Sequence, residues 1–580
     1  MTETAYTGAS APSSRAVIGI RLVAAWLQAM ALLVLTQAAS SSPVRWPATE
    51  PLVFDPLLSA SVFVPLIVMA GCSQLGRRPL AIWSIVAAVA VMTLGYHHAA
   101  REKLADGSYG SLRIVSVWET IPFWLIVSAA LFVAHVCVVD AVTERRFMPS
   151  YKRHFDTAWM LGLQAALSVG FVGVFWAVLE LGAALFRLVD IDVFSRLLRH
   201  DWFYFPATTL ALALAIHATD AQPALIRGAR SIVLTLFSWL LPLLVVILAT
   251  FLGSLPFISL RPLWSTHFAT GLLLTAAGLL IFLINCCYQD GQGSVQVGKL
   301  KRASGSAGAI LLLPLTGLAG WALGLRVEEY GWTVERINAA AIIILFLCYT
   351  LGYASASIRP KPWLQGVERT NFLAAGVFVA LTAALCSPVA DPARLMVASQ
   401  MAALESGRIP ADEFDFSAIR FDGARWGNAA LQALAARQDA ASASIASDAK
   451  AALGLTNRFG APAPHSREVT MFPPGSTLPP GFGEAQIPVQ CEWEKCVGHR
   501  LALKPGAPES LLVVGLFVGE VFDTDSHGEW HQSYSLQGNF SCAGFRDALQ
   551  AGTFAPVPHD VPDIAIGGQT FSLTPIRNGC

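Results

Sequence analysis

The sequence predicts a bundle of about 11 transmembrane helices followed by a small α+β domain. Apolar residues make up 54% of the 580-residue chain and charged residues only 13%, and the mean hydropathy is +0.54. The apolar residues form long runs up to about position 390, and the polar residues gather in the loops and beyond that point. This pattern is typical of a polytopic membrane protein and excludes an ordinary soluble enzyme. The formal net charge is zero, so no basic balance indicates a nucleic-acid partner.

The first apolar run follows a polar tail, residues 1–14, and covers Val17–Ala39. Its leader is long for a signal peptide, so we expect an uncleaved first helix in which Arg21 snorkels toward the interface. Further runs of spanning length lie at about 57–75, 79–97, 118–139, 157–186, 202–218, 231–252, 266–288, 306–325, 338–356 and 370–389. The segment after Glu180 is amphipathic and is expected to extend the fifth helix along the interface, so the count is 10 to 12.

Lysine and arginine are distributed unevenly between the two sets of loops. The richer set holds Arg77, Arg78, Arg145, Arg146, Lys152, Arg153, Arg227, Arg230, Lys299, Lys301, Arg302, Arg359, Lys361 and Arg369. Because cytoplasmic loops carry the excess of positive charge, we place this set and the N-terminus in the cytoplasm. With 11 spans, everything after Pro388 then lies outside, which in a Gram-negative cell means an inner-membrane protein with a periplasmic C-terminal domain.

The polar part has its own organisation. The transmembrane domain is assigned to residues 15–390, a helical pair to 391–438, an Ala/Ser/Pro-rich linker to 439–485 and the small α+β domain to 486–580. Asp391-Pro392 predicts an N-cap and first-turn proline for a helix that runs to Glu405 and ends before Gly407. From Ile487 the pattern changes to short β-like runs, which are Arg500–Lys504, Leu511–Phe522, Trp530–Leu536 and Ile564–Leu573.

One charged segment interrupts the apolar pattern between the spans at 306–325 and 338–356. We interpret it as an interfacial loop made of Arg326, Glu328, Glu329, Tyr330, Trp332, Glu335 and Arg336. The two aromatic rings suit the headgroup level, and charges of both signs are expected to pair. The loop is therefore interpreted as structural.

Ionisable residues near the bilayer midplane would indicate a coupled carrier, because they are costly there. The centres of the predicted helices lack them, and Glu180 is the best intramembrane acidic candidate. Gly320 and Gly324 have the spacing of a close helix–helix contact.

Two groups of residues in the polar part suggest binding or cross-linking chemistry. Weak metal candidates cluster between two predicted strands: Asp523, Asp525, His527, Glu529 and His531. They begin like a calcium loop, but the twelfth position is Tyr534 instead of glutamate. A solvated hairpin tip explains the same residues with no ligand, and we favour it. The exported cysteines are Cys491, Cys496, Cys542 and Cys580; we expect disulfides, with a local Cys491–Cys496 bridge and a Cys542–Cys580 bridge as one of three pairings.

Several sequence blocks taken together carry a family resemblance. They are Leu255-Pro256-Phe257 with Leu263-Trp264, Asn285–Gly291 (NCCYQDG), Leu312–Leu315, Arg326–Arg336, and a final set around Ser399-Gln400, Phe414-Asp415-Phe416 and Trp426-Gly427. In this order they resemble the bacterial membrane family catalogued as domain of unknown function 4153. The resemblance covers roughly residues 15–440. It implies a membrane fold and carries no activity.

The leading hypothesis is a non-enzymatic inner-membrane protein that displays a periplasmic domain in envelope signalling, assembly or maintenance. A permease or channel-like transporter of a small or apolar solute is the alternative, and a membrane-embedded enzyme is third. We find no nucleophile elbow, phosphate loop or paired catalytic carboxylates, so no catalytic residue and no cofactor is assigned. The expected partners are the lipid bilayer and an unidentified envelope protein, with no nucleic acid.

Overall fold

The computed structural model describes residues 14–103, 117–189, 191–257, 269–291, 298–358, 363–437, 443–455, 469–473, 475–483, 486–492, 496–501, 509–515, 518–524, 530–537, 548, 551, 564–566 and 569–571. The chain divides into two compact units. The first comprises residues 1–414 and 422–430, and the second comprises residues 415–421 and 431–580.

The described part of the first unit is built from helices. In chain order these are α1 (Ser14–Ser40), α2 (Pro51–Gly71), α3 (Arg77–Arg101), α4 (Val117–Glu144), α5 (Tyr151–Arg187), α6 (Val193–Arg199), α7 (Asp201–Asp220), α8 (Pro223–Ser254), α10 (Ala269–Tyr288), α11 (Lys299–Tyr330), α12 (Val334–Ile358), α13 (Gly366–Leu385) and α14 (Pro392–Glu405). A helix satisfies its own backbone hydrogen bonds, which an apolar medium requires of any segment that crosses it.

Nine helices in the described residues are long and apolar enough to cross a membrane: α1, α2, α3, α4, α5, α8, α10, α11 and α12. The chain is therefore a multi-pass membrane protein. The predicted runs at 202–218 and 370–389 correspond to α7 and α13, which lie outside this set. Each has 20 residues and carries charged side chains close to an end, such as Asp201 and Glu368.

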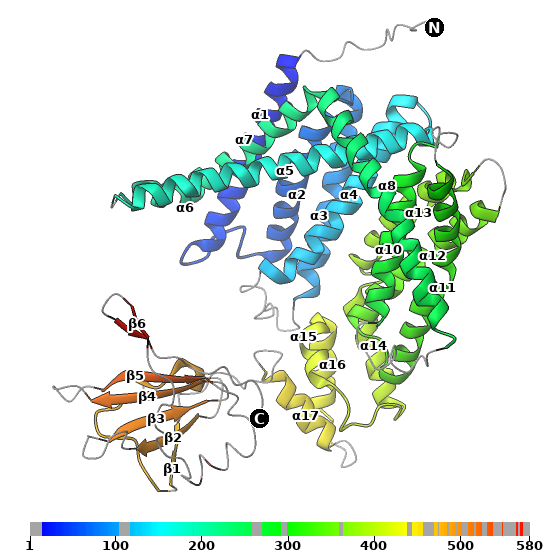
Figure 1. Cartoon of the computed structure of the whole chain (residues 1–580). Helices are drawn as coiled ribbons and strands as arrows, with labels where there is room; N and C mark the ends of the chain where they lie inside the picture. Colours follow the sequence, from blue (N-terminus) through cyan, green and yellow to red (C-terminus); the bar gives the residue numbers. More distant parts are fainter. Residues whose placement is uncertain are drawn as a thin grey trace, which may run out of the picture. The chain divides into compact units, whose positions relative to one another are not determined.

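The long helices form two groups with separate cores (Figure 1). In the amino-terminal group, α1 packs on α2 and α7 around Ala25, Met69 and Ala213, and α2 packs on α3 and α4 around Phe63, Val91 and Val127. In the carboxyl-terminal group, α8, α10, α11, α12 and α13 share one large apolar core.

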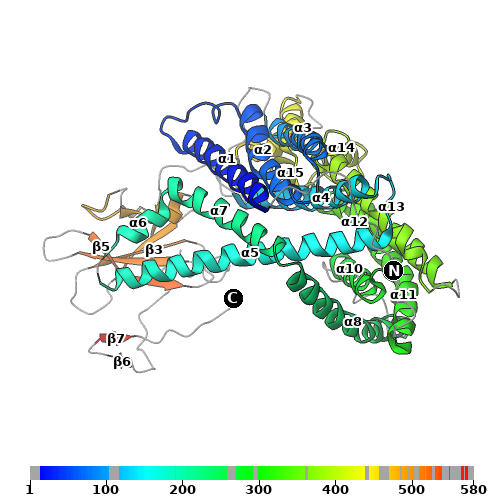
Figure 2. The same cartoon turned by 90° about the horizontal axis from the view of Figure 1, so that it is seen from above.

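Helix α5 connects the two groups. Its first turns pack into the carboxyl-terminal core through Tyr151 and Phe155, and farther along the Gln164 amide donates to the main-chain oxygen of Ile216 on α7, at 3.0 Å. Both views show α5 running crosswise to α2 and α3 (Figures 1 and 2). The segment predicted as the fifth span therefore contacts both helix groups.

The second unit contains helices and a small sheet region. Its helical segments are α15 (Phe416–Asp422) and α17 (Ala443–Leu453), while α16 (Ala424–Ala435) begins in the first unit and ends in the second. The five-stranded sheet has the order β1 (Val469–Phe472), β2 (Cys496–Leu501), β3 (Ser510–Val514), β4 (Val518–Thr524) and β5 (Trp530–Gln537). The β1–β2 pair is parallel and the remaining pairs are antiparallel. A separate hairpin joins β6 (Ile564–Ile566) to β7 (Gln569–Phe571).

Three segments after residue 390 differ from the sequence interpretation. The segment expected to be a helical pair contains α14, α15 and α16, and the expected linker contains α17 and β1. The run Leu511–Phe522, interpreted as one strand, is a hairpin: the Gly515 amide donates to the Val518 carbonyl at 2.9 Å and the chain reverses there. Periodicity alone could not show this reversal, because both strands continue the same apolar pattern.

Candidate functional site

Buried polar side chains are the natural candidates for a site in an apolar bundle, because each must find a partner or incur a desolvation cost. Four clusters stand out among the described residues of the first unit. Each joins side chains from different helices, so we describe each by what it connects.

The first cluster centres on Arg21 of α1, whose side chain is 1% exposed. The guanidinium donates to the Met69 carbonyl at 2.9 Å and to the Asp220 carboxylate at 2.8 Å. It also lies 3.2 Å from His217 Nδ1. The expectation that Arg21 snorkels to the interface is wrong, because this pairing on α2 and α7 replaces the water that snorkelling would supply.

The second cluster joins α4 to α5. Asp140 is 0% exposed and accepts a hydrogen bond from the Thr157 hydroxyl at 2.6 Å. Its carboxylate also pairs with His154 at 3.0 Å and with Arg153 at 3.4 Å. A carboxylate this buried is stable only with such partners, so the cluster fixes the α4–α5 corner.

The third cluster is a closed amide–tyrosine network in the carboxyl-terminal group. Asn371 Nδ2 donates to the Tyr151 hydroxyl at 2.8 Å and to Asn285 Oδ1 at 2.6 Å. The Tyr353 hydroxyl donates to Asn371 Oδ1 at 2.6 Å, and Asn285 Nδ2 donates back to the Tyr353 oxygen at 2.7 Å. The network joins α5, α10, α12 and α13, and its described polar atoms bond to one another.

The fourth cluster lies where α14 meets α3. Asp391 accepts hydrogen bonds from the amides of Ala393 and Arg394, at 2.9 and 3.4 Å, which confirms its predicted role as the N-cap of a helix ending at Glu405. Its other oxygen lies 2.8 Å from His97 Nε2 and 3.8 Å from Arg101 Nε. The Trp426 ring lies beside His97, with 6.4 Å between ring centroids.

For Asp391, the effect of its hydrogen-bonding and charged partners on the pKa outweighs the effect of burial. Burial alone would raise the pKa of this carboxyl, but the His97 hydrogen bond and the Arg101 charge leave it below its usual value. The ionised carboxylate is therefore the form that the folded chain favours.

The predicted interfacial loop is mostly helical. Helix α11 continues through Arg326, Glu328 and Glu329 and ends at Tyr330, and Gly331, with φ of 72°, turns the chain into α12. The Arg336 guanidinium donates to the Gly331 carbonyl at 2.5 Å and lies 5.5 Å from the centre of the Tyr330 ring. Trp332 lies in the turn and Glu335 in the first turn of α12.

The remaining predicted site residues are dispersed. Glu180 is exposed on α5. Asp523 and His531 are register partners across β4 and β5, whereas Asp525, His527 and Glu529 lie outside the described residues. Within the part of the chain that the structure describes, no three His, Cys, Asp or Glu side chains gather as a metal site.

One predicted disulfide is present. Cys491 and Cys496 are bonded, with their Cα atoms 5.5 Å apart, and both side chains pack into the core of the sheet. Cys542 and Cys580 lie outside the described residues. The bridge therefore ties Cys491 to the first residue of β2.

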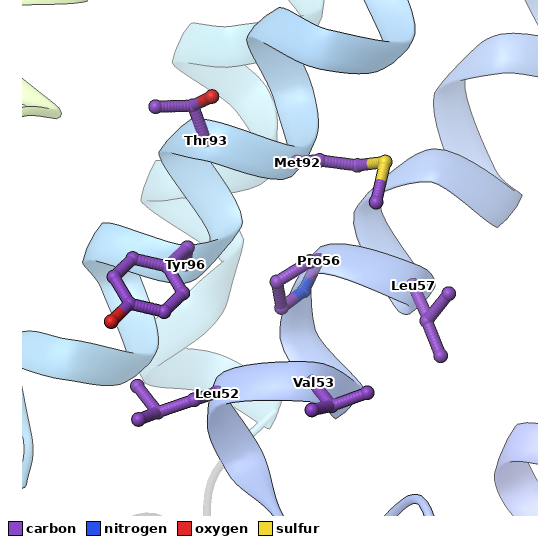
Figure 3. A pocket seen from close by; sticks show the side chains of 7 residues that line it. All are labelled: Leu52, Val53, Pro56, Leu57, Met92, Thr93 and Tyr96. Atoms are coloured by element: carbon purple, nitrogen blue, oxygen red, sulfur yellow. The ribbon is translucent and has the colours of Figure 1, made fainter.

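A shallow apolar groove lies between α2 and α3, with a volume of about 460 Å³. Figure 3 shows its lining side chains, Leu52, Val53, Pro56, Leu57, Met92, Thr93 and Tyr96. Only the Thr93 and Tyr96 side chains bring hydroxyl groups, so the groove suits an apolar ligand.

The sequence interpretation missed His97, Asn285 and Asn371 as site residues. Charged side chains at helix centres mark a midplane site in the sequence, whereas these residues are neutral amides or a histidine near a helix end. A search for any polar side chain with strong hydrogen-bonding capacity inside an apolar run would have found them.

Comparison with known families identifies the family of the chain. A family model described as a domain of unknown function, DUF4153, matches residues 63–424, which is more than half of the chain. No curated protein matches the chain, and no solved structure matches it. The matched segment includes helices of both groups together with α14, and the chain therefore belongs to the DUF4153 family.

Proposed function

We propose that this protein is a non-enzymatic inner-membrane scaffold that holds its second unit in the periplasm for envelope signalling, assembly or maintenance. The observation that carries the proposal is the amide–tyrosine network. Its amide and hydroxyl groups are bonded to one another across four helices, as expected of groups that fix a bundle.

The second unit supports the same proposal. It is a compact unit with its own sheet, core and disulfide. Disulfides persist in oxidising compartments such as the periplasm, which agrees with the side assigned from the positive-inside rule. A folded domain outside the bilayer can contact envelope proteins that the helices cannot reach.

A carrier of a small apolar solute is the second candidate. The groove between α2 and α3 favours it, because its lining is almost wholly apolar and a solute could enter it from the lipid. A scaffold would bind its protein partner on the second unit, whereas a carrier would bind its solute in the groove. Crosslinking from each of these two places can therefore separate the two functions.

The test is photo-crosslinking of the full chain in cells. A photoreactive amino acid is placed at Tyr534, which is exposed on β5, and in a second strain at Met92 in the groove. The control position is Glu509, also exposed in the second unit. The scaffold predicts one discrete protein adduct from position 534 and none from position 509.

A small-molecule or lipid adduct confined to position 92, together with uptake of that compound by vesicles containing the protein, would replace the scaffold with the carrier. No adduct at position 534 or at other exposed sites of the sheet would refute the scaffold.

A further inference from the structure

Helix α14 contacts both helix groups. At its N-cap, Asp391 joins it to α3 of the amino-terminal group through His97 and Arg101. Farther along, Ser399 and Gln400 meet the turn between α11 and α12 of the carboxyl-terminal group. The helix therefore bridges two groups that have separate cores.

The two attachments differ in kind. The one at Asp391 is buried, involves an ionised carboxylate and also caps the helix. The one at the turn consists of neutral contacts at partly exposed positions: Gln400 Nε2 donates to the carbonyls of Tyr330 and Trp332, each at 2.9 Å, and the Trp332 amide lies 3.4 Å from the Ser399 hydroxyl. Hydrogen bonds to a buried charge contribute more than exposed neutral ones, so the turn separates from α14 first.

The turn is also built to keep its shape when it separates. Within it, the Gly331 amide donates to the Val327 carbonyl at 2.9 Å, and Arg336 holds the Gly331 carbonyl. These contacts involve no residue of α14. Opening therefore breaks the contacts to Gln400 and Ser399 and leaves the end of α11 joined to the start of α12.

We propose that the α11–α12 turn is a latch on α14: Gln400 holds it closed, its opening frees the carboxyl-terminal group to move against α14, and α14 itself stays fixed to α3. The chain continues from α14 into the second unit, so the latch gives the bundle a way to sense or transmit movement of that unit. Only this use rests on the proposed function, since the movement itself can be tested without a partner.

Amide hydrogen exchange of the full chain in lipid nanodiscs tests the latch. In the unaltered protein, the Trp332 amide should exchange at least about tenfold faster than the Ala393 amide, which Asp391 holds. This comparison needs no variant. Equal rates, or slower exchange at Trp332, would overturn the proposal.

Two variants then open the latch by different routes. Gln400→Ala removes the donor, whereas Gly331→Ala places a Cβ 2.9 Å from Gln400 Nε2 and also strains the backbone, because alanine rarely adopts a φ of 72°. Both should speed exchange at Trp332 by about tenfold, the factor expected for the loss of two neutral hydrogen bonds, and leave Ala393 unchanged.

Gly324→Ala on α11 is the control, because a Cβ there meets nothing within 4 Å. It should change neither rate. If Gln400→Ala leaves Trp332 as protected as before, Gln400 does not hold the turn and the latch is refuted.

Discussion

At the scale of single residues, burial and pairing decide how much each charged side chain contributes to the stability of the fold. Arg21, Asp140 and Asp391 are almost completely buried, and each has a partner of opposite charge on another helix. Such a pair does not necessarily stabilise a protein relative to an apolar pair, but removal of one partner leaves an uncompensated charge. Substitution of these residues should therefore be costly.

The N-caps of α14 and α15 provide a matched test of this point. Asp391 and Asp415 both cap a helix, but only Asp391 is buried and charge-paired. We expect Asp391→Ala to lower the free energy of unfolding by about 3 kcal/mol or more and Asp415→Ala by about 1 kcal/mol. Unfolding of the purified protein in mixed micelles measures both, and equal losses would contradict the role given to His97 and Arg101.

Glu520 should give the second unit a pH-dependent stability. It lies on β4 opposite Val513, on the core face of the sheet, and burial raises the pKa of its carboxyl. The folded state then favours the protonated form, so stability falls as the pH rises from the unfolded pKa through the folded one, and stays lower above it. Glu520→Gln should therefore raise the unfolding temperature of this unit at pH 7 and have no effect at pH 4.

The exposed Glu509 of the same unit supplies the control. Glu509→Gln should shift stability by less than about 0.5 kcal/mol at either pH. If Glu520→Gln stabilises the unit equally at pH 4 and pH 7, the effect is not one of ionisation.

At the scale of helices, close approach occurs where a small residue faces a side chain of the neighbouring helix. The spacing of Gly320 and Gly324 predicted such an approach, but a Cβ at Gly324 would meet nothing within 4 Å and one at Gly320 meets only Ile343 at 4.0 Å. A close approach lies instead at Gly352 of α12, against Thr370 of α13. Spacing identifies glycines that could pack closely, and the rotation of the helix decides which of them do.

Substitution at Gly352 should therefore be destabilising. Gly352→Ala forces a methyl group against the Thr370 side chain, and overpacking of this kind costs about 1–3 kcal/mol. Gly317→Ala on α11, where a Cβ has open space, should cost less than about 0.5 kcal/mol. Thermal unfolding of the two variants in detergent provides the comparison, and a harmless Gly352→Ala would show that α12 and α13 pack less tightly than described.

The basic and aromatic residues along α11 predict where the hydrocarbon layer begins and ends on this helix. Lys301 lies 4.3 Å above the ring of Trp239 near one end of the helix, and Trp321 is 59% exposed farther along it. The 20 residues from 301 to 321 rise about 30 Å, the thickness of the hydrocarbon layer, and exposed tryptophans favour its two boundaries. Spin labels along the helix should therefore show the highest oxygen accessibility near Ile310 and the highest accessibility to a water-soluble relaxant at Leu300 and Leu325. A maximum of oxygen accessibility at either end would contradict this placement.

At the scale of the whole molecule, the side of the membrane on which each segment lies is the main prediction. The richer set of positive loops assigns the N-terminus to the cytoplasm and the chain after Ala390 to the periplasm. Alkaline phosphatase fused after Ala390 should be active and fused after Arg153 inactive. The reverse pattern would invert the orientation, and activity at both positions would mean that the number of crossings between them is even.

The sequence predicted the coarse fold and little of the candidate sites. The apolar runs located the long helices, since bilayer thickness and backbone hydrogen bonding leave few alternatives. Asp391-Pro392 predicted the start of α14, because capping depends on neighbouring residues. The partners of Asp391 could not be predicted in the same way, because His97 is 294 positions away in the chain.

By itself, then, the sequence determined the membrane class, the positions of the long apolar helices, the amino end of α14 and the local Cys491–Cys496 bridge. These features depend on composition or on residues close together in the chain. Only the tertiary structure decided that α5 runs crosswise, that Asn285, Tyr353 and Asn371 form one network, and that α14 joins both helix groups. Those features depend on the rotation and crossing of helices distant in sequence, which many similar apolar surfaces permit and only packing selects.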